Sequence, residues 1–414
     1  MRDLDCPVGC AIVATMNSPI DDLQFCWPHL RVVMEGLSIL DVPRLQVKSM
    51  EEATHFIQAF GFDPIDPQDI ELIWSFFEES VAFIDRILAD PEYPRVPEHL
   101  RTRAAVNDIR RLLLLSSESG GVDQLWACAL LRVMHVLIHL AHDPRLRYFD
   151  QVQKQVLSRL DNYLYVDPSD GATYLGTRKE PERIKLLFFK KKDRKDRDRE
   201  TIKLLHKAAN LVEEIYDRIG FRLVTETKFD AIRAIRLLLE KNIVSLPNIR
   251  PGRTRNQLVD LARFREETDR IRKLAKKMGN VNSSVYEKMS KRLERRIGIR
   301  LLGRSLLNPH SSEFYHAIQF TCRELVKVRN PMYHVYSTLK SQVDSLPEGS
   351  HILAEVFPRP VKPSDYVFFP FEIQIMDVKS YADSIFGKSN HEEYRRKQLE
   401  AARTRVFGKK RHES

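Results

Sequence analysis

Two segments far apart in the chain alternate apolar and polar residues, and each carries an acidic residue. The first runs from Ile215 to Thr227 and contains Asp217, and the second runs from Phe371 to Ile375 and contains Glu372. Alternation with a period of two is typical of a β-strand, whose successive side chains point to opposite faces of a sheet. We therefore expect each strand to present one carboxylate on the open face of a buried sheet. Two carboxylates that meet there can hold one Mg²⁺, a cation that prefers oxygen ligands.

A third segment lies between these two in the sequence. The turn-rich stretch 308–319 leads into another predicted strand and offers the aromatic ring of Tyr315. Acid, aromatic ring and acid, in this order on three strands, resemble the synthetase domain of the RelA/SpoT family. The enzymes of that family make the alarmone (p)ppGpp.

The resemblance extends to the motifs around these residues. The family's first strand, with the pattern D-x-I-x-x-R-x-V-x-E-T, is matched by Asp217, Ile219, Arg222, Val224, Glu226 and Thr227. Its Pro-Gly-Arg turn is matched by residues 251–253, its G-Y-Q-S-I-H strand by 314–319 and its E-I-Q-I-R-T strand by 372–377. A later helix motif, A-x-x-G…H-x-x-Y-K, is loosely echoed by Ala382, Gly387, His391, Tyr394 and Arg395.

The resemblance implies a fold, a reaction and roles for individual residues. The implied fold is α+β, with a mixed sheet flanked by helices, and the reaction moves the β,γ-pyrophosphate of ATP to the 3′-hydroxyl of a guanosine nucleotide or a related acceptor. Asp217 and Glu372 are expected to hold Mg²⁺, with Glu372 also helping to deprotonate the attacking hydroxyl, and Tyr315 to stack on the acceptor base. The other substrate-binding residues implied are Gln374, placed beside the metal, together with Arg222, His391 and the basic residues that grip ATP, namely Arg178, Lys179, Arg183 and Lys185.

Some positions depart from the family pattern. Met376-Asp377 replaces the usual Arg-Thr, Gln319 replaces a histidine, and Phe314 replaces a glycine. Because these positions concern the acceptor, another nucleotide or a tRNA end is an alternative acceptor. A second hypothesis is a catalytically weakened protein that binds nucleotide or RNA in a regulatory role. A third is an interaction scaffold built on the helical half of the chain.

The chain is basic, with a formal net charge of +10 and a pI near 9.3. A surplus of positive charge favours polyanionic partners, and free nucleotides and RNA both qualify. The charged run Lys190–Arg199 is interpreted mainly as a solvated face, and residues 401–414 as a basic tail.

Helical and strand patterns divide the chain near residue 150. Residues 1–150 are predicted to form a helical domain, because 70–89 and 122–142 repeat apolar residues at helical spacing. Residues 160–400 are predicted to form the synthetase-like domain, beginning with a linker at Asp161–Asp170 and containing an exposed helical insertion at 255–298. The strands expected in this domain are 183–189, 219–226, 313–324, 351–357 and 366–376.

A histidine cluster in the helical half raises a further alternative. Three histidines and an aspartate lie within residues 135–143, and a His-Asp pair is the core of the HD-type metal phosphohydrolases that long RelA/SpoT enzymes carry ahead of the synthetase. The remaining ligands would come from His99 and Asp150, whose spacing is poor. The three histidines share one helical face, which equally suits packed side chains, and we prefer that interpretation.

The sequence is expected to belong to a cytoplasmic protein that does not enter the membrane. No window approaches the roughly 18 consecutive apolar residues of a membrane span, and the apolar stretch 11–16 is too short for a secretory signal. Five cysteines, an odd number, fit a reducing compartment rather than a disulfide framework. Cys6, Cys10 and Cys26 lack a fourth metal ligand at sensible spacing and are interpreted as ordinary thiols. The sequence has no Gly-rich Walker loop, so a P-loop ATPase is not expected.

Overall fold

The computed structural model describes residues 25–178, 183–192, 196–207, 215–279, 282–298, 316–344, 349–386 and 391–408. The chain divides into two units. A helical unit comprises Met1–Asp143, Lys195–Glu214 and Glu392–Ser414, and a sheet unit comprises Pro144–Arg194 and Ile215–His391. The chain therefore returns to the helical unit twice after residue 143, whereas the predicted domains follow one another along the sequence.

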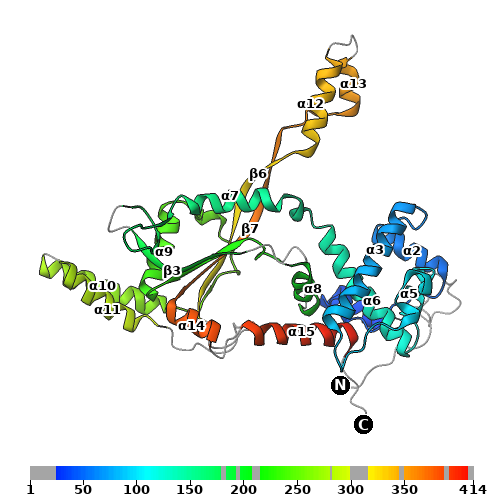
Figure 1. Cartoon of the computed structure of the whole chain (residues 1–414), viewed down its shortest axis with the longest axis horizontal. Coiled ribbons are helices and arrows are strands. Elements are labelled where there is room, and N and C mark those ends of the chain that lie inside the picture. The colour runs from blue at the N-terminus through cyan, green and yellow to red at the C-terminus, as the bar shows by residue number, and fades with distance from the viewer. Residues whose placement is uncertain are drawn as a thin grey trace. The chain divides into compact units, whose positions relative to one another are not determined.

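The helical unit is built from helices, most of which bury apolar side chains (Figure 1). The helices are α1 Trp27–Glu35, α2 Met50–Phe60, α3 Pro67–Phe83, α4 Arg103–Val106, α5 Arg110–Leu115, α6 Val122–Ala141, α8 Arg197–His206 and α15 His391–Phe407, of which Glu392 onward belongs to this unit. The helix predicted at 70–89 is confirmed as α3 with its continuation, a π-helical turn at Ile84–Leu88, and that at 122–142 as α6. Shorter 3₁₀ turns occur at Ile39–Asp41 and Glu98–Leu100.

Local signals explain where α3 begins. Asp66 accepts a hydrogen bond from the backbone N of Gln68, and Pro67 occupies the first position of α3, where its missing N–H costs nothing.

Helix α6 is long and apolar enough to cross a membrane. However, 61% of its most apolar window is buried inside the structure, as in the core helix of a soluble domain.

The sheet unit is a mixed α+β structure, as predicted. Its elements are α7 Phe149–Asp161, β1 Leu164–Val166, β2 Thr173–Leu175, β3 Ile184–Lys191, β4 Gly220–Thr225, α9 Lys228–Glu240, β5 Arg255–Asn256, α10 Leu261–Met278, α11 Ser283–Arg296, β6 Ile318–Arg329, α12 Pro331–Val343, α13 Gly349–Val356, β7 Ser364–Asp377 and α14 Val378–Phe386, with 3₁₀ turns at Pro144–Tyr148 and Leu246–Asn248. Seven strands form one sheet in the order β1-β2-β3-β4-β7-β6-β5. Strands β4 and β7 are parallel, and every other pair is antiparallel.

Strand register gives the sheet one covered face and one largely polar face. Phe221 and Leu223 of β4 and Ile373 and Ile375 of β7 point to the covered face, where none is more than 3% exposed. Helices α7 and α9 contribute apolar side chains to the same core. The alternate residues of these strands point to the opposite face, and α14 lies on that side (Figure 1). The polar face is where the predicted site residues of β4 and β7 are found.

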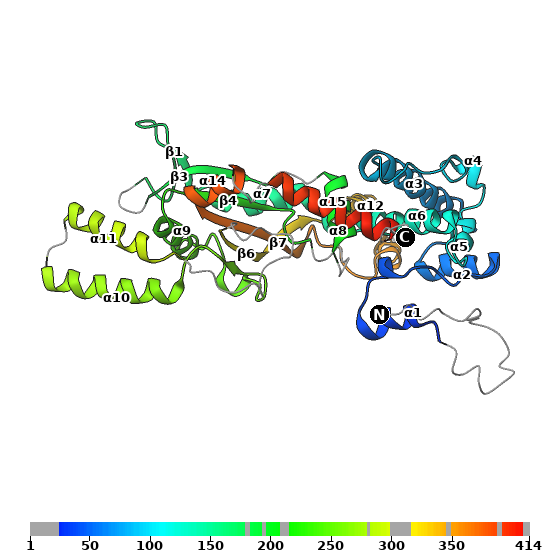
Figure 2. The ribbon, with the colours of Figure 1, turned by 90° about the horizontal axis from the view of Figure 1, so that it is seen from below.

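Two long segments extend from the sheet. Helices α10 and α11 lie side by side as a helical hairpin within the predicted insertion (Figure 2). Strands β6 and β7 continue as a two-stranded ribbon that ends in α12 and α13 (Figure 1). The ribbon thus carries a second helical hairpin at its end.

Two expectations for this unit were wrong. The strand predicted at 351–357 is the helix α13, because a short apolar run fits either structure and here it packs on another helix, with Phe357 edge-on to Tyr336 of α12 at 5.3 Å. The predicted linker Asp161–Asp170 contains β1, an edge strand of the sheet. Strands β3, β4 and β7 match their predictions, and β6 begins at Ile318, later than predicted.

Candidate functional site

The polar face of the sheet is organised in rows of residues that are neighbours across the strands. The first row is Gly220, Glu372 and Thr321, the second is Lys190, Arg222, Gln374, Gln319 and Arg255, and the third is Phe188, Val224 and Met376. The third row is apolar, and Tyr381 of α14 covers it by stacking on Phe188 at 5.0 Å between ring centroids. The first two rows are polar and form the candidate site.

Gly220 lets the backbones of β4 and β7 approach closely at the first row. The backbone O of Gly220 accepts a hydrogen bond from Lys192 N at 2.8 Å, and Glu372 is the neighbour of Gly220 on the other side. A Cβ atom on Gly220 would lie 2.1 Å from the backbone O of Glu372, so a larger residue cannot fit without displacing a strand. Across this glycine, Nζ of Lys192 forms an ion pair with Oε2 of Glu372.

Glu372 is held by three donors. Oε2 receives Nζ of Lys192 and, at 3.1 Å, Nε2 of Gln374, while Oε1 accepts from Nε2 of Gln319. Only 6% of Glu372 is exposed. A carboxylate so nearly buried needs both a counter-charge and hydrogen bonds, and these three side chains supply them.

Gln374 connects this carboxylate to a guanidinium in the second row. Its Oε1 accepts from Nε and Nη2 of Arg222 at 3.1 and 2.9 Å, which leaves its NH₂ group to face Glu372. Lys190 on β3 and Arg255 on β5 lie further along the same row, and both are exposed. The second row is therefore a band of cations beside one carboxylate.

Two arginines hold the segment that precedes β4. The ring of Tyr216 lies 4.2 Å from the guanidinium carbon of Arg250 and 4.7 Å from that of Arg253. The predicted Pro-Gly-Arg turn is formed here, and Gly252 has a φ of +75°, which favours glycine. Arg250 N also donates to Thr321 O at 2.8 Å, which ties the turn to the first row.

Asp217 belongs to this segment and lies outside β4. It is half-buried and precedes Gly220, the sheet neighbour of Glu372, by three residues, a stretch that spans at most about 10 Å. Arg218, between them, is only 2% exposed. Asp217 is therefore within about 10 Å of the first row along the chain.

The structure brings together Glu372, Gln374 and Arg222 of the predicted site residues. Three further predicted positions lie outside the described residues, namely Lys179, Tyr315 and the side chain of His391.

The basic residues predicted to grip ATP lie elsewhere on the sheet. Arg178 and Arg183 lie over the rings of Tyr165 and Tyr174, at 5.4 and 4.4 Å, and Lys185 is the sheet partner of Tyr174. These tyrosines belong to the β1–β2 hairpin. Because β3 and β4 lie between β2 and β7, roughly 14 Å separates the hairpin from the strand of Glu372. The role of Arg178, Arg183 and Lys185 in binding ATP stays a prediction, and the contacts described for these side chains are with the β1–β2 hairpin.

Sequence reasoning missed the roles of Lys192 and Gln319. Interpreting Lys190–Arg199 as a solvated face is wrong for Lys192, whose side chain is 20% exposed and paired with Glu372. The sequence did contain a signal for Lys192. Lys190 and Lys192 stand two residues apart at the end of the apolar run 184–189, and this spacing puts their side chains on one face of a strand. Gln319 lies where the family pattern has a histidine, and its amide donates to Glu372.

Met376 and Asp377, which replace the family's Arg-Thr, have packing and capping roles. Met376 is fully buried in the third row. Oδ1 of Asp377 accepts from Ser380 N at 3.1 Å and so caps the first turn of α14.

The histidines of the helical unit pack against aromatic rings. The rings of His135 and His139 are 4.4 Å apart, and each lies edge-on to Phe60, at 6.0 and 6.2 Å. His142 contacts two further phenylalanines. Burial, with a smaller effect from His139, lowers the pKa of His135 from 6.5 to about 4. His135 is therefore uncharged at neutral pH, which suits an apolar contact.

Comparisons of the chain with family models, with curated proteins and with solved structures found no match.

Proposed function

We propose that the polar face of the sheet is the site of a Mg²⁺-dependent pyrophosphotransferase similar to the RelA/SpoT synthetases. The observation that carries the proposal is the setting of Glu372, a single nearly buried carboxylate that Lys192 and Arg222 surround with positive charge. A nucleoside triphosphate carries several negative charges, and its reaction needs cations close to the phosphoryl oxygens. A polar sheet face with this charge pattern suits such a substrate.

The residues present fit a magnesium ion chemically. Glu372 and Asp217 supply carboxylate oxygens, and Mg²⁺ is usually held by one or two carboxylates together with substrate phosphates. The ammonium group of Lys192 against Oε2 of Glu372 indicates that this position accepts a cation. When bound, Mg²⁺ would neutralise charge on the transferred phosphates.

The chain's own residues have defined tasks in the proposed reaction. The acceptor's 3′-hydroxyl oxygen forms a bond to the β-phosphorus of ATP, the bond from that phosphorus to the α,β-bridging oxygen breaks, and AMP leaves. Glu372 takes the hydroxyl proton, while Arg222 and the exposed cations Lys190 and Arg255 bind phosphate oxygens. Gln374 keeps the carboxylate oriented between these groups.

The β6–β7 ribbon favours an RNA end as the acceptor. Beyond the first row, the cross-strand pairs on the same face are Arg323 with Pro370, Leu325 with Phe368, Lys327 with Tyr366 and Arg329 with Ser364. Tyr366 and Phe368 are 64% and 50% exposed, and the Arg323 guanidinium lies 5.4 Å from the Phe368 ring. Alternating cations and exposed aromatic rings are the elements that bind single-stranded nucleic acid.

A binding protein without turnover is the second candidate function. The observation that favours it is that Glu372 already has three partners, so Lys192 and two amides must be displaced before the carboxylate can act. Such a protein would bind nucleotide or RNA on the same face in a regulatory role.

One assay separates the two candidates. The full chain is incubated with Mg²⁺, labelled ATP and an acceptor panel of GDP, GTP, other nucleotides and deacylated tRNA, and AMP and labelled product are measured. We expect release of AMP with a pyrophosphorylated acceptor, and loss of both in Glu372→Gln and in Asp217→Asn. ATP binding without any product would support the regulatory alternative.

Glu324→Gln is the matched control for this assay. Glu324 is also 6% exposed and ion-paired, but it lies on the covered face of β6, against Arg159. Its replacement should leave the transfer rate unchanged. Normal turnover by Glu372→Gln would exclude the proposed site.

A further inference from the structure

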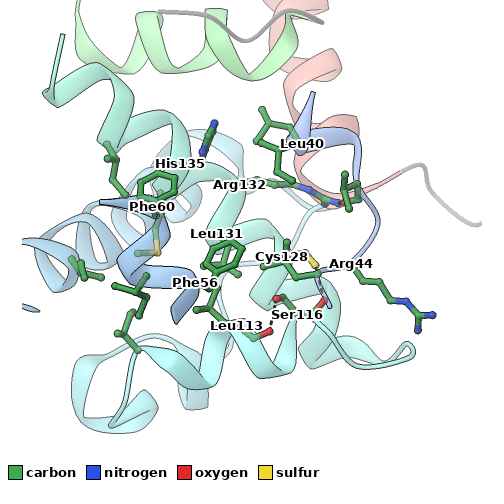
Figure 3. A pocket seen from close by; sticks show the side chains of 18 of the residues that line it. Leu40, Arg44, Phe56, Phe60, Leu113, Ser116, Cys128, Leu131, Arg132 and His135 are labelled. Carbon is green, nitrogen blue, oxygen red and sulfur yellow. Dashed lines mark hydrogen bonds between the residues drawn. The ribbon is translucent and has the colours of Figure 1, made fainter. Parts of the chain in front are cut away.

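The helical unit contains an apolar pocket that the proposed function does not use (Figure 3). It encloses about 300 Å³, at the low end of the range of roughly 300–1,000 Å³ for small-molecule sites. Helices α2, α5 and α6 and the segment 39–45 supply most of its wall. The pocket lies entirely within the helical unit.

Most of the wall is uncharged. Phe56, Phe60, Leu113 and Leu131 supply aromatic and aliphatic surface. His135 belongs to this wall, and because burial lowers its pKa to about 4, it adds no charge at neutral pH.

One half-buried cation, Arg132, interrupts the apolar wall. Arg132 lies below Leu40, on the side of the pocket away from Phe60 (Figure 3). Its Nη1 donates to Val406 O at 2.7 Å and its Nη2 to Val42 O at 2.8 Å. Within the part of the chain that the structure describes, it forms no ion pair. Partial burial lowers the pKa of Arg132 from its ordinary value.

The acidic residue that acts on Arg132 already has a partner. Both carboxylate oxygens of Asp41 accept from Arg405, from Nε and Nη2, each at 2.7 Å. Asp41 therefore gives both of its oxygens to Arg405, and within the described residues Arg132 has two carbonyl partners and no ion pair. A second arginine of the wall, Arg44, points away from the pocket (Figure 3).

We propose that this pocket binds a small amphipathic carboxylic acid, with its apolar chain against Phe56, Phe60 and Leu131 and its carboxylate at Arg132. The chain would fill an apolar cavity, and the carboxylate would supply the missing counter-charge through charge-assisted hydrogen bonds. Arginine has five N–H donors, and the two carbonyl bonds use two of them. A neutral ligand would fill the cavity but would not neutralise the guanidinium of Arg132. A cationic ligand would be repelled by that guanidinium.

The ligand preference is tested on the full chain by calorimetric titration with three probes of equal chain length. These are decanoate, decan-1-ol and decyltrimethylammonium. We expect decanoate to bind at least about tenfold more tightly than the alcohol, as a charge-assisted hydrogen bond provides, and the ammonium compound not to bind. Equal affinity for decanoate and decanol, or no binding of decanoate, would overturn the proposal.

Variants then locate the ligand. Arg132→Gln should remove the advantage of decanoate over decanol while decanol still binds, which shows that the pocket is intact. Arg44→Gln is the matched control and should leave decanoate affinity unchanged. Leu131→Trp should fill the cavity and abolish binding of both probes at an unchanged thermal unfolding midpoint. Full decanoate binding by Arg132→Gln would contradict the assigned role of this arginine.

Discussion

At the scale of single residues, the pair Lys192–Glu372 determines how the site behaves. The carboxylate is nearly buried, so removing its counter-charge leaves a poorly solvated anion that only two amides support. We expect Lys192→Met to lower the free energy of unfolding by about 2 kcal/mol, measured by urea denaturation. Lys191→Met should lower the free energy of unfolding by less than about 1 kcal/mol, because Asp161, the ion-pair partner of Lys191, is exposed.

The double variant Lys192→Met with Glu372→Gln tests whether the two charges stabilise the fold as a pair. Since both charges are then gone, most of the lost stability should return. If the double variant were as unstable as the sum of the two single variants, the two charges would not be coupled.

The neutral His135 predicts a loss of stability in acid. Its pKa is about 4 in the folded chain and 6.5 as an ordinary histidine, so between pH 6.5 and 4 the unfolded state binds more protons than the folded state. The stabilisation is therefore complete above pH 6.5 and is lost as the pH falls toward 4, by up to about 3 kcal/mol. Unfolding of His135→Gln should depend less on pH in this range. His55→Gln, at an exposed position on α2, should keep the wild-type dependence.

At the scale of elements, Gly220 sets the distance between β4 and β7. A Cβ atom at Gly220 would lie 2.1 Å from the backbone O of Glu372. A backbone atom in a strand cannot move away by rotating a bond, as the end of a flexible side chain can. We expect Gly220→Ala to destabilise the sheet unit by about 1–3 kcal/mol or more, and to abolish nucleotide binding by shifting Glu372.

Gly298→Ala is the control for this substitution. The nearest atom to a Cβ at Gly298 is Nζ of Lys228 at 3.9 Å, an ordinary contact, so its replacement should change stability by less than about 0.5 kcal/mol. Equal unfolding midpoints for the two glycine variants would show that β4 and β7 can separate without loss.

The same strands show how far sequence reasoning extends. Alternation along β7 predicted Glu372 on the polar face, and the resemblance to the RelA/SpoT family added Arg222 and Gln374. The strand register places all three on one face, because side-chain direction is a local property of a strand. Which strands become neighbours is not local. Pairing of β3 with β4 brings Lys192 to Glu372 across 180 residues of sequence, and no local pattern encodes that contact. The strand prediction at 351–357 was wrong because the local pattern was ambiguous: a short apolar run fits a strand and a helix equally well. Packing against α12 makes this segment the helix α13.

At the scale of the whole molecule, the helical unit depends on the end of the chain. Arg403 donates from Nε to Leu88 O at 2.9 Å, and the Phe407 ring stacks on Tyr93 at 5.2 Å. Arg405 supplies the counter-charge of Asp41. We therefore expect a fragment of residues 1–150 to lack a cooperative thermal transition, and a chain ending at residue 390 to lose the transition of its helical unit. A chain ending at residue 408, which retains α15, should unfold like the full chain, whereas a stably folded 1–150 fragment would contradict this dependence.

The face of the β6–β7 ribbon makes a prediction that distinguishes an RNA acceptor from a free nucleotide. A single strand lying along it would release counterions at each contacted phosphate, so its affinity should fall steeply with salt, with a slope of about −0.7 per contact. Replacing Lys327 and Arg329 together with Gln should reduce that slope by about 1.4 and leave the affinity for GTP unchanged. The control variant replaces Lys276 and Lys277, two exposed lysines at the end of α10, with Gln, and should keep the wild-type slope. Titrations of a labelled single-stranded RNA and of GTP at several salt concentrations measure both quantities. If the ribbon and control variants changed the slope equally, the effect would belong to the overall charge, and a free nucleotide would be the better acceptor.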